Sequence, residues 1–544
     1  MSQQPFVISV NPASSVVNRT GAWRTMRPEY VSLLPPCNHA CPAGENIQAW
    51  LGLAMESRER EAWEQLVQDN PFPAIHGRVC YHPCEDACNR TKLDEPVAIH
   101  AVERHLGDRA LREGWKIRAS APTNKRVLVV GAGPSGLACA YHLARRGHVV
   151  EIYESAEKAG GMMRYGIPAY RLPRDVLDGE IQRVLDLGVT LHLRAPVADL
   201  MTLLQQGSFD AAFLAIGAQT AKRVDIPTRD AGRIVDAVKL LHDLGEGRTP
   251  DVKLGRRVAV YGGGNTALDA ARTAMRLGAA ETVIVYRRDQ AHMPAHESEL
   301  REALDEGVIV HWLRTVQSVE AGRIQVEVME LDEKGTPRPT GRIETIEADT
   351  LILALGQTCQ SEFLRNVPGL VFGGDGVLNV DANMMTGYPG LFAGGDMVPA
   401  QRSVTTGVGH GKKAARNIDA YLRGAQYTPA PKPPLATFER LNTWYYERLM
   451  RARQPELDLR KRQAGFDEIH GSLAPDSARA EAQRCLSCGN CFACDNCYAV
   501  CPDNAVLKLG PGRGYAFNLD YCKGCSLCVK ECPCGAIASI AETG

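Results

Sequence analysis

The stretch RVLVVGAGPSGLACAYHLARRGHVVEIYE, residues 126–154, decides the fold of this chain. An apolar run, a glycine turn, a helical segment and a second apolar run predict a βαβ unit. A G-x-G-x-x-G turn between strand and helix is typical of a dinucleotide site, because glycine lets the backbone approach the pyrophosphate. Glu154 ends the second strand, where an acid suits a ribose without a 2′-phosphate, as in FAD or NAD. The turn residues expected to bind are Gly131, Gly133, Pro134, Ser135 and Gly136.

A second unit of the same kind spans residues 256–288, RRVAVYGGGNTALDAARTAMRLGAAETVIVYRR. Two such units in one chain predict two nucleotide-binding domains. The second strand here ends in Arg287 and Arg288, whose guanidinium groups favour the 2′-phosphate of NADP. The alternative is a solvated basic pair. The turn residues expected to bind are Gly262, Gly263, Gly264, Asn265 and Thr266.

Sixteen of the 18 cysteines gather at the two ends of the chain. The tail repeats the run C-x2-C-x2-C-x3-C-P, which is the bacterial two-cluster ferredoxin pattern, and the fourth cysteine of each run binds the other cluster. Structural zinc is the alternative, but it does not explain the repeat. The first [4Fe–4S] site is predicted from Cys491, Cys494, Cys497 and Cys532, and the second from Cys522, Cys525, Cys528 and Cys501.

Residues 35–425 resemble the small subunit of glutamate synthase and its relatives, which include the N-terminal part of dihydropyrimidine dehydrogenase. Besides the two glycine turns, the shared motifs are CPAGENIQAW, GRVCYHPCEDAC, EPVAIHAVERH, GGMMRYGIPAYRLP, YRRDQAHMPA and LFAGGDMVP. The resemblance implies FAD at the first turn and a nicotinamide nucleotide at the second. It implies that Asp396 contacts FAD; the alternative is a turn aspartate. The other FAD contacts that it implies are Gly161, Arg164, Gly356 and Gly395.

The resemblance also implies a helical N-terminal domain with two [4Fe–4S] clusters, for which this end of the chain supplies only five cysteines. The family's R-C-L-x-C pair is missing upstream, yet EAQRCLSC, residues 481–488, reads like it. One cluster is therefore expected from Cys37, Cys88, Cys485 and Cys488, and another from Cys41, Cys80 and Cys84. The resemblance implies that a non-cysteine ligand in the segment AIHAVERH completes the second cluster, which points to Glu103. The alternatives are an exposed helical glutamate at position 103 and a lead-in to the ferredoxin fold without metal at the EAQRCLSC pair.

The remaining features exclude several classes of protein. A formal net charge of −1 gives no reason to expect nucleic acid or an anionic membrane surface. We find neither a secretory signal nor a membrane-spanning run, and clustered cysteines are typical of metal sites in a reducing compartment, which predicts the cytoplasm. Residues 223–355 contain no cysteine, so the redox C-x-x-C of thioredoxin reductase is absent. The lone Cys139 and Cys359 are expected to be buried, and Cys534 to be spare.

The sequence thus predicts a multidomain α/β protein with a helical iron–sulfur domain, two Rossmann-like domains, one inserted in the other, and a ferredoxin-like tail. Its expected function is electron transfer between NAD(P)(H) and a protein partner through FAD and four [4Fe–4S] clusters. The partner is a 2-oxoacid oxidoreductase or a glutamate synthase-like enzyme. The alternatives are a free-standing NAD(P)H:ferredoxin-type oxidoreductase and a non-catalytic carrier. The expected domains are 1–122 (iron–sulfur), 123–222 and 356–427 (FAD), 223–355 (NAD(P)), 428–480 (linker) and 481–544 (ferredoxin).

Overall fold

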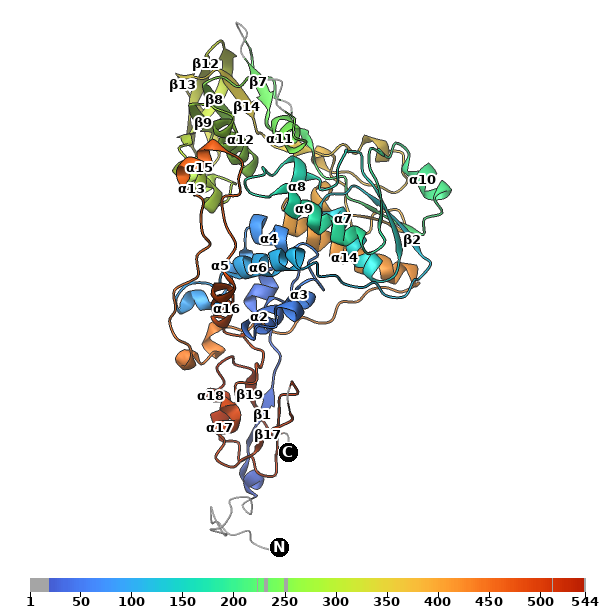
Figure 1. Cartoon of the computed structure of the whole chain (residues 1–544), viewed down its shortest axis with the longest axis vertical. Coiled ribbons are helices and arrows are strands. Elements are labelled where there is room, and N and C mark those ends of the chain that lie inside the picture. Colours follow the sequence, from blue (N-terminus) through green and yellow to red (C-terminus); the bar gives the residue numbers. More distant parts are fainter. Residues whose placement is uncertain (1–18, 223, 229–232, 249–252, 511, 543–544) are drawn as a thin grey trace.

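The computed structural model is elongated (Figure 1). The ferredoxin-like tail forms one narrow end, the helical N-terminal domain the middle and the NAD(P)-binding domain the other end, while the FAD-binding domain projects to one side of the middle. The structure describes residues 19–222, 224–228, 233–248, 253–510 and 512–542. Within these ranges, no helix is both long and apolar enough to cross a bilayer.

The FAD-binding domain is built on a parallel five-stranded sheet in the order β16-β5-β2-β3-β4. The apolar runs of the opening motif form β2 and β3, which pair in register from Arg126 with Val149 to Val130 with Tyr153. Between them lies α7, which packs against the glycine-bearing face of α14. The elements are β2 (Arg126–Val130), α7 (Pro134–Arg145), β3 (Val149–Tyr153), α8 (Met162–Tyr165), α9 (Arg174–Leu185), β4 (Thr190–His192), α10 (Leu200–Gln206), β5 (Ala211–Leu214), β16 (Leu391–Ala393) and α14 (Val404–Leu422).

The NAD(P)-binding domain repeats this arrangement, with a parallel sheet in the order β10-β9-β8-β14-β7 and an added antiparallel sheet, β11-β12-β13. The chain enters and leaves it through β6 (Thr220–Ala221) and β15 (Gln357–Thr358), which pair antiparallel. The predicted insertion of one domain in the other is therefore confirmed. The elements are β7 (Ile234–Asp236), α11 (Ala237–Gly245), β8 (Arg257–Tyr261), α12 (Asn265–Arg276), β9 (Glu281–Tyr286), α13 (Glu297–Asp305), β10 (Ile309–Trp312), β11 (Arg314–Glu320), β12 (Arg323–Leu331), β13 (Pro337–Glu347) and β14 (Thr350–Leu353).

The N-terminal domain is helical, as predicted, and its cysteines lie at helix ends or in the turns beside them. Two glycines bring α4 and α6 into backbone contact: a Cβ on Gly77 would overlap Arg104, and one on Gly107 would overlap Ala74. Trp50 and Trp63 are fully buried in its core. The helices are α1 (Pro36–Ala40), α2 (Ile47–Met55), α3 (Glu59–Leu66), α4 (Pro73–Val79), α5 (Pro83–Asp86) and α6 (Ile99–Arg112).

The ferredoxin-like tail receives one strand from the other end of the chain. β1 (Met26–Tyr30) pairs antiparallel with β19 (Ile537–Ala541), and the ring of Tyr30 stacks on Phe517 at 4.9 Å. The sequence pattern did not predict this strand. The other elements of the tail are α17 (Asn496–Ala499), β17 (Val506–Lys508), β18 (Tyr515–Phe517) and α18 (Leu527–Lys530).

The segment between α14 and the tail does more than link two domains, because it travels to the far end of the molecule and back (Figure 1). α15 (Leu459–Ala464) lies on the NAD(P)-binding domain, where the Gln463 side chain donates a hydrogen bond to the carbonyl of Glu306 (2.7 Å). The ring of His470 lies 2.9 Å from the carboxylate of Glu302. Burial alone would raise the pKa of Glu302, but His470 and Arg272 together lower it to about 2. α16 (Pro475–Gln483) then packs on the N-terminal domain.

Candidate functional site

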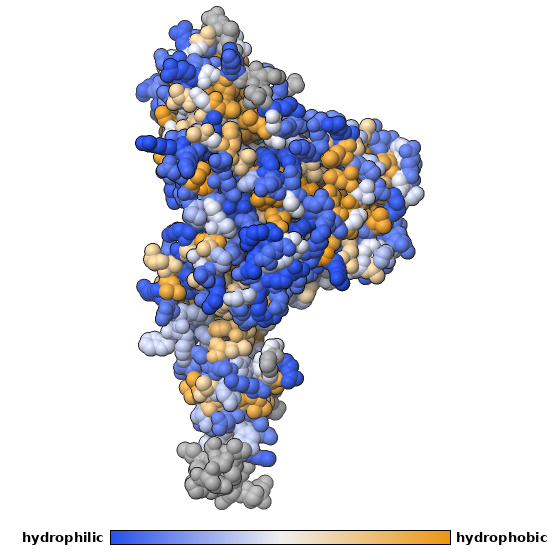
Figure 2. Space-filling view, in the orientation of Figure 1, coloured by the Kyte–Doolittle hydropathy of each residue, from blue (hydrophilic) through white to orange (hydrophobic). Residues whose placement is uncertain are grey.

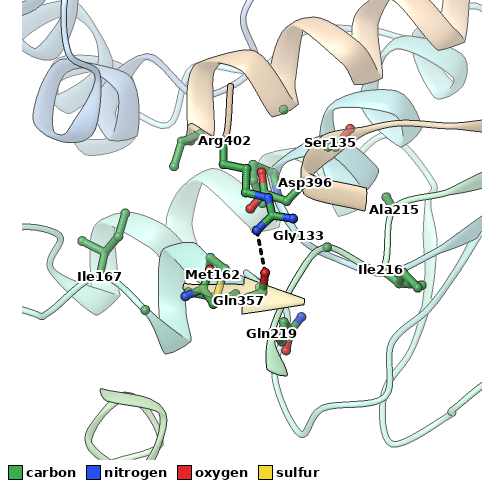
Figure 3. Close-up of a pocket in the computed structure, with 18 of the residues that line it drawn as sticks. Gly133, Ser135, Met162, Ile167, Ala215, Ile216, Gln219, Gln357, Asp396 and Arg402 are labelled. Carbon is green, nitrogen blue, oxygen red and sulfur yellow. Dashed lines mark hydrogen bonds between the residues drawn. The ribbon is translucent and has the colours of Figure 1, made fainter. Parts of the chain in front are cut away.

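One cavity of about 740 Å³ lies where the FAD-binding, NAD(P)-binding and N-terminal domains meet. Its size is that of a site for a large organic cofactor. Figure 3 shows residues from both parts of the FAD-binding domain facing one another across it, with Arg402 donating to the carbonyl of Gln357 (2.9 Å). The predicted residues that line it are Gly131, Gly133, Pro134, Ser135, Glu154, Gly161, Gly264, Asn265, Thr266, Gly395 and Asp396.

The first glycine turn presents free hydrogen-bonding groups to this cavity. Gly131 has a φ of +103°, and a Cβ there would overlap the carbonyl of Ala215 at the end of β5. α7 begins after Gly133 without a side-chain cap. The hydroxyl of Ser135 is buried and has no partner in the protein. Exposed N–H groups and an unpaired hydroxyl at a helix N-terminus fit a pyrophosphate, so the residues suit the expected FAD.

Glu154 lines the cavity and also shapes the turn. Its carboxylate accepts hydrogen bonds from the backbone N–H of Ala132 (2.7 Å) and of Ala156 (2.8 Å), and its side chain is 5% exposed. The acid therefore holds β2 and β3 in register at their carboxyl ends.

The second FAD motif, from the other half of the domain, lies directly beside the first. A Cβ on Gly395, whose φ is +74°, would stand 3.0 Å from the Cβ of Ser135. About two turns into α14, a Cβ on Gly411 would overlap the carbonyl of Ser135, so glycine is required for α7 and α14 to pack. Asp396 points into the cavity, and burial raises the pKa of its carboxyl while Arg402 partly offsets this.

The second glycine turn reaches the cavity only through its later residues. Gly262 and Gly263 are packed inside the NAD(P)-binding domain, where a Cβ on Gly263 would overlap the ring of Tyr286. Arg287 and Arg288 follow β9, outside the cavity lining, and neither forms an ion pair with a described residue. The assignment of the 2′-phosphate to these arginines stays a prediction.

Three further predicted contacts do not line the cavity. Gly136 is buried at the start of α7, where a Cβ would overlap the carbonyl of Gly131. Arg164 is buried, and its guanidinium binds the carbonyl of Ala159 (2.6 Å) and Asp178. Gly356 lies beside the lining residue Gln357 with a φ of +107°. These three residues therefore support the residues that line the cavity and do not line it themselves.

The cavity also has a wall that the sequence did not reveal. Val79 and Tyr81, from the N-terminal domain, line it together with the two glycine turns. Both flank Cys80, whose thiol is hydrogen-bonded by Thr405 at the start of α14. A predicted cluster ligand thus stands one residue away from the nucleotide cavity. In the sequence, both residues stand in the cysteine-rich segment, but nothing there indicates that their side chains face the nucleotide cavity.

The C-terminal pair Cys485 and Cys488, here called the fold-back pair, lies beside two cysteines of the N-terminal domain. Cys485 and Cys488 line one small cavity with Cys37 and Cys88. Burial and the neighbouring Cys488 thiol raise the pKa of Cys485 to about 12, as expected when four thiols share a site without a metal.

The loop that carries the pair is held in place by protein contacts. Arg484 binds Asp94 (2.9 Å) and the carbonyl of Glu95 (2.7 Å), while Arg90 donates to the carbonyl of Arg484 (2.5 Å). The loop therefore keeps its position through charge-assisted hydrogen bonds that do not involve the cysteines.

The inner site contains Cys41, Cys80 and Cys84 beside two buried carboxylates. Glu103 is 6% exposed, so it is not the exposed helical residue considered above. The Asn70 amide donates to Glu103 (2.7 Å) and to Glu45 (3.0 Å). Burial, then Glu45, raises the pKa of Glu103 well above its usual range. Two carboxylates buried together are costly unless a cation neutralises them, so this donor set fits an iron cluster. Glu45 was missed because nothing in its sequence context marks it.

A buried lysine ties the inner site to the FAD-binding domain. Lys412, on α14, donates to the carbonyls of Ala43 (2.9 Å) and Gly44 (2.7 Å) and pairs with Asp69 (2.6 Å). Burial lowers the pKa of its ammonium, while Asp69 opposes this. The loop after Cys41 is thereby fixed against the helix that lines the cavity.

The tail brings the ferredoxin cysteines together in the two predicted groups. Cys491, Cys494 and Cys532 raise the pKa of Cys497 after burial, and the second group of Cys501, Cys522, Cys525 and Cys528 lines a separate cavity. Cys534 is buried with its sulfur 3.7 Å from that of Cys532. The lone Cys139 and Cys359 are buried, as expected.

Comparison with known proteins identifies all three parts of the chain. Residues 125–415 match the pyridine nucleotide-disulphide oxidoreductase family, residues 31–115 match dihydropyrimidine dehydrogenase domain II with its 4Fe-4S cluster, and residues 490–536 match a 4Fe-4S dicluster domain. The iron–sulfur matches favour iron over the zinc alternative in the tail.

Three curated relatives extend over most of the chain. The β subunit of the NADP(+)-dependent formate dehydrogenase of Moorella thermoacetica is 37% identical over 83% of this chain and 70% of its own length. The β subunit of the NADPH-Fe(3+) oxidoreductase of Geobacter sulfurreducens is 32% identical (83% and 75%). The small chain of the NADPH glutamate synthase of Escherichia coli is also 32% identical (71% and 89%). The chain therefore belongs to the pyridine nucleotide-disulphide oxidoreductase family, in the glutamate synthase small-chain-like group, and is an oxidoreductase that uses FAD, NAD(P)(H) and [4Fe–4S] clusters.

Proposed function

We propose that this chain is the electron-transfer subunit of a larger oxidoreductase and exchanges electrons between NAD(P)(H) and a protein partner. One observation carries the proposal: Val79 and Tyr81, on either side of Cys80, line the same cavity as the two dinucleotide turns. A nucleotide cavity and a cysteine site that share a wall give electrons a short path out of the cavity. A free nucleotide-binding module has no need of this arrangement.

The helices that contain or adjoin the cysteine sites follow one another toward the narrow end of the molecule: α4 and α5, then α16, then α17 and α18 (Figure 1). The inner site adjoins the cavity through Cys80. The fold-back site follows, and Tyr446 connects it to the tail: its hydroxyl donates to the carbonyl of Leu486 (3.0 Å), and its ring lies near Cys488 and Cys494. The first ferredoxin site and then the second complete the series.

The expected cofactors supply a two-electron to one-electron junction, because FAD exchanges hydride with nicotinamide and passes single electrons to iron–sulfur clusters. The residues of the chain position these groups. Ser135 and the N-terminus of α7 would hold the pyrophosphate of FAD, and Asp396 would accept from its ribityl–phosphate part. The second turn, with Arg287 and Arg288 beyond it, would hold the nicotinamide nucleotide, and we favour NADP.

The electrons leave at the tail, where a partner must dock. Cys491, Cys494 and Cys525 are exposed, so these sites come close to the protein surface. The hydroxyl of Tyr445 donates to Glu531, which places this segment against the tail. The side chain of the preceding residue, Trp444, is 87% exposed. Figure 2 shows further hydrophobic residues among polar ones on this end. Large exposed apolar side chains are typical of a protein-binding surface.

We propose a cytoplasmic partner that carries the terminal redox site, a 2-oxoacid oxidoreductase or a glutamate synthase-like enzyme. The relative from Moorella thermoacetica, the β subunit of a formate dehydrogenase, adds formate dehydrogenase to this set. A free-standing NAD(P)H:ferredoxin-type oxidoreductase is the second candidate, favoured by the ferredoxin-like tail itself. A stable stoichiometric companion in an affinity purification from native extract supports the subunit; its absence, together with reduction of added ferredoxin, supports the free-standing enzyme.

The first test is to measure iron, sulfide and flavin on protein purified without oxygen, followed by titration with NADPH and NADH. We expect about sixteen irons per FAD, from four clusters of four irons. NADPH should bleach both the flavin and the cluster absorbance. About eight irons, or bleaching of the flavin alone, would contradict the proposed electron path.

A further inference from the structure

Tyr81 connects the iron–sulfur domain to the nicotinamide-binding domain. Its hydroxyl accepts a hydrogen bond from the side-chain amide of Asn265 (2.6 Å), in the second glycine turn. Its ring stacks on His296 with the centroids 4.9 Å apart. His296 precedes α13 and donates its backbone N–H to the Asn265 side-chain oxygen (2.9 Å). Both ends of the Asn265 amide are therefore occupied.

This arrangement decides what the N-terminus of α12 can bind. Asn265 is the first residue of α12, and an asparagine oxygen at such a position can bind neighbouring backbone N–H groups. Here Tyr81 and His296 hold the amide away, and α12 has no side-chain cap. Gly264, Asn265 and Thr266 line the cavity, and a Cβ on Gly264 would meet nothing within 4 Å. The turn stays open toward the cavity.

The hydroxyl of Tyr81 has a second use. It accepts from Asn265, so its own proton is free to be donated. A phenol proton at the edge of the cavity suits an acceptor such as a phosphate or ribose oxygen.

We propose that Tyr81 is a positioning residue for the nicotinamide nucleotide, supplied by the iron–sulfur domain: it holds the Asn265 amide nitrogen, so that the amide oxygen stays on the N–H of His296 and the N-terminus of α12 is left free for the pyrophosphate. This inference rests on the proposed function. It assigns part of the nucleotide site to the segment between two predicted cluster ligands, Cys80 and Cys84. Nucleotide affinity then depends on how the N-terminal domain is seated.

The test uses the full chain loaded with FAD and clusters, in wild-type form and with Tyr81→Phe. The phenylalanine keeps the ring stacked on His296 and removes only the hydroxyl. Titration with NADP+ and NAD+, followed by the flavin absorption spectrum, gives the dissociation constants without turnover. We expect a rise of about fivefold for the preferred nucleotide, as for one neutral hydrogen bond. The limiting rate of flavin reduction at saturating NAD(P)H and the cluster EPR signals should stay unchanged.

The matched control is Tyr141→Phe, whose hydroxyl also joins two domains, through a bond to the carbonyl of Val67 (2.7 Å), but does not line the cavity. Unchanged affinity in Tyr81→Phe, or the same loss in both variants, overturns the inference. A wild-type protein that binds neither nucleotide overturns the proposed function instead, so the two failures can be told apart.

Discussion

Replacing Cys485 and Cys488 by serine tests whether a cluster is shared between the two ends of the chain. Both thiols are buried in the small cavity that they line with Cys37 and Cys88. Serine has nearly the same volume as cysteine, so the packing around the cavity is kept. The Arg484 contacts, which do not involve either thiol, keep the loop in place. The double variant should therefore fold.

The expected change is the loss of one cluster and no other. Iron should fall from about sixteen to about twelve per chain, and the cluster absorbance by about a quarter, because one of four clusters is lost. FAD content should stay at one per chain, since the cavity is elsewhere. NAD(P)H should still bleach the flavin, but reduction of the tail clusters should be lost, because the fold-back site is the step between the inner site and the tail.

The assay is iron and sulfide analysis of protein purified without oxygen, with EPR spectra after reduction by dithionite and by NADPH. Cys139→Ser is the control, because it replaces a buried thiol that stands alone inside α7. Full iron content in the double variant would refute the shared cluster. Loss of about eight irons would also refute the reasoning, since the tail sites would then depend on the same pair.

Three further predictions concern packing and charge. Gly411→Ala should destabilise the protein by about 1–3 kcal/mol and lower its FAD content, because the added methyl group overlaps α7. Gly52→Ala, whose methyl group would meet nothing within 4 Å, should be neutral or stabilising, and thermal unfolding and flavin analysis compare the two variants. Lys412→Met should cost about 2–4 kcal/mol and weaken the inner cluster's EPR signal, whereas the exposed Lys413→Met should change neither. Glu302→Gln should lower the free energy of unfolding by about 2 kcal/mol at pH 7. Because folding lowers the pKa of Glu302 from 4.5 to about 2, the difference in stability between wild type and variant should shrink as the pH falls from 4.5 to 2. Equal differences at pH 7 and at pH 3 in denaturant titrations would contradict this prediction.

The parts of the fold that the sequence predicted are those that local patterns encode. The glycine turns of α7 and α12 follow apolar runs, and the cysteine spacings repeat within a few residues, so both can be read without tertiary information. The fold-back pair was predictable only because its motif resembles one that the family carries elsewhere. Each of these features depends on short stretches whose geometry is fixed by the residues themselves.

The parts that were missed depend on contacts between distant segments. β1 looks like an ordinary extended stretch until β19 pairs with it, more than 500 residues later. Glu45 is recognised as part of the inner site only in the folded protein, where α6 brings Glu103 to the same side chain, Asn70, that binds Glu45. Tyr81 faces the nicotinamide-binding domain because that domain is seated on the N-terminal one. No local pattern encodes such a placement, since it results from the packing of whole domains.

The pairing of β1 with β19 has a consequence for how the protein is made. A ribosome releases Met26–Tyr30 first and Ile537–Ala541 almost last, so the early strand waits for its partner throughout synthesis. Cys37 and Cys88 wait in the same way for the EAQRCLSC segment. The nucleotide-binding domains, in contrast, can close as soon as α14 emerges. The predicted cluster that joins the two ends of the chain would therefore form last, and a nascent chain that stalls late would hold an unfinished set of clusters.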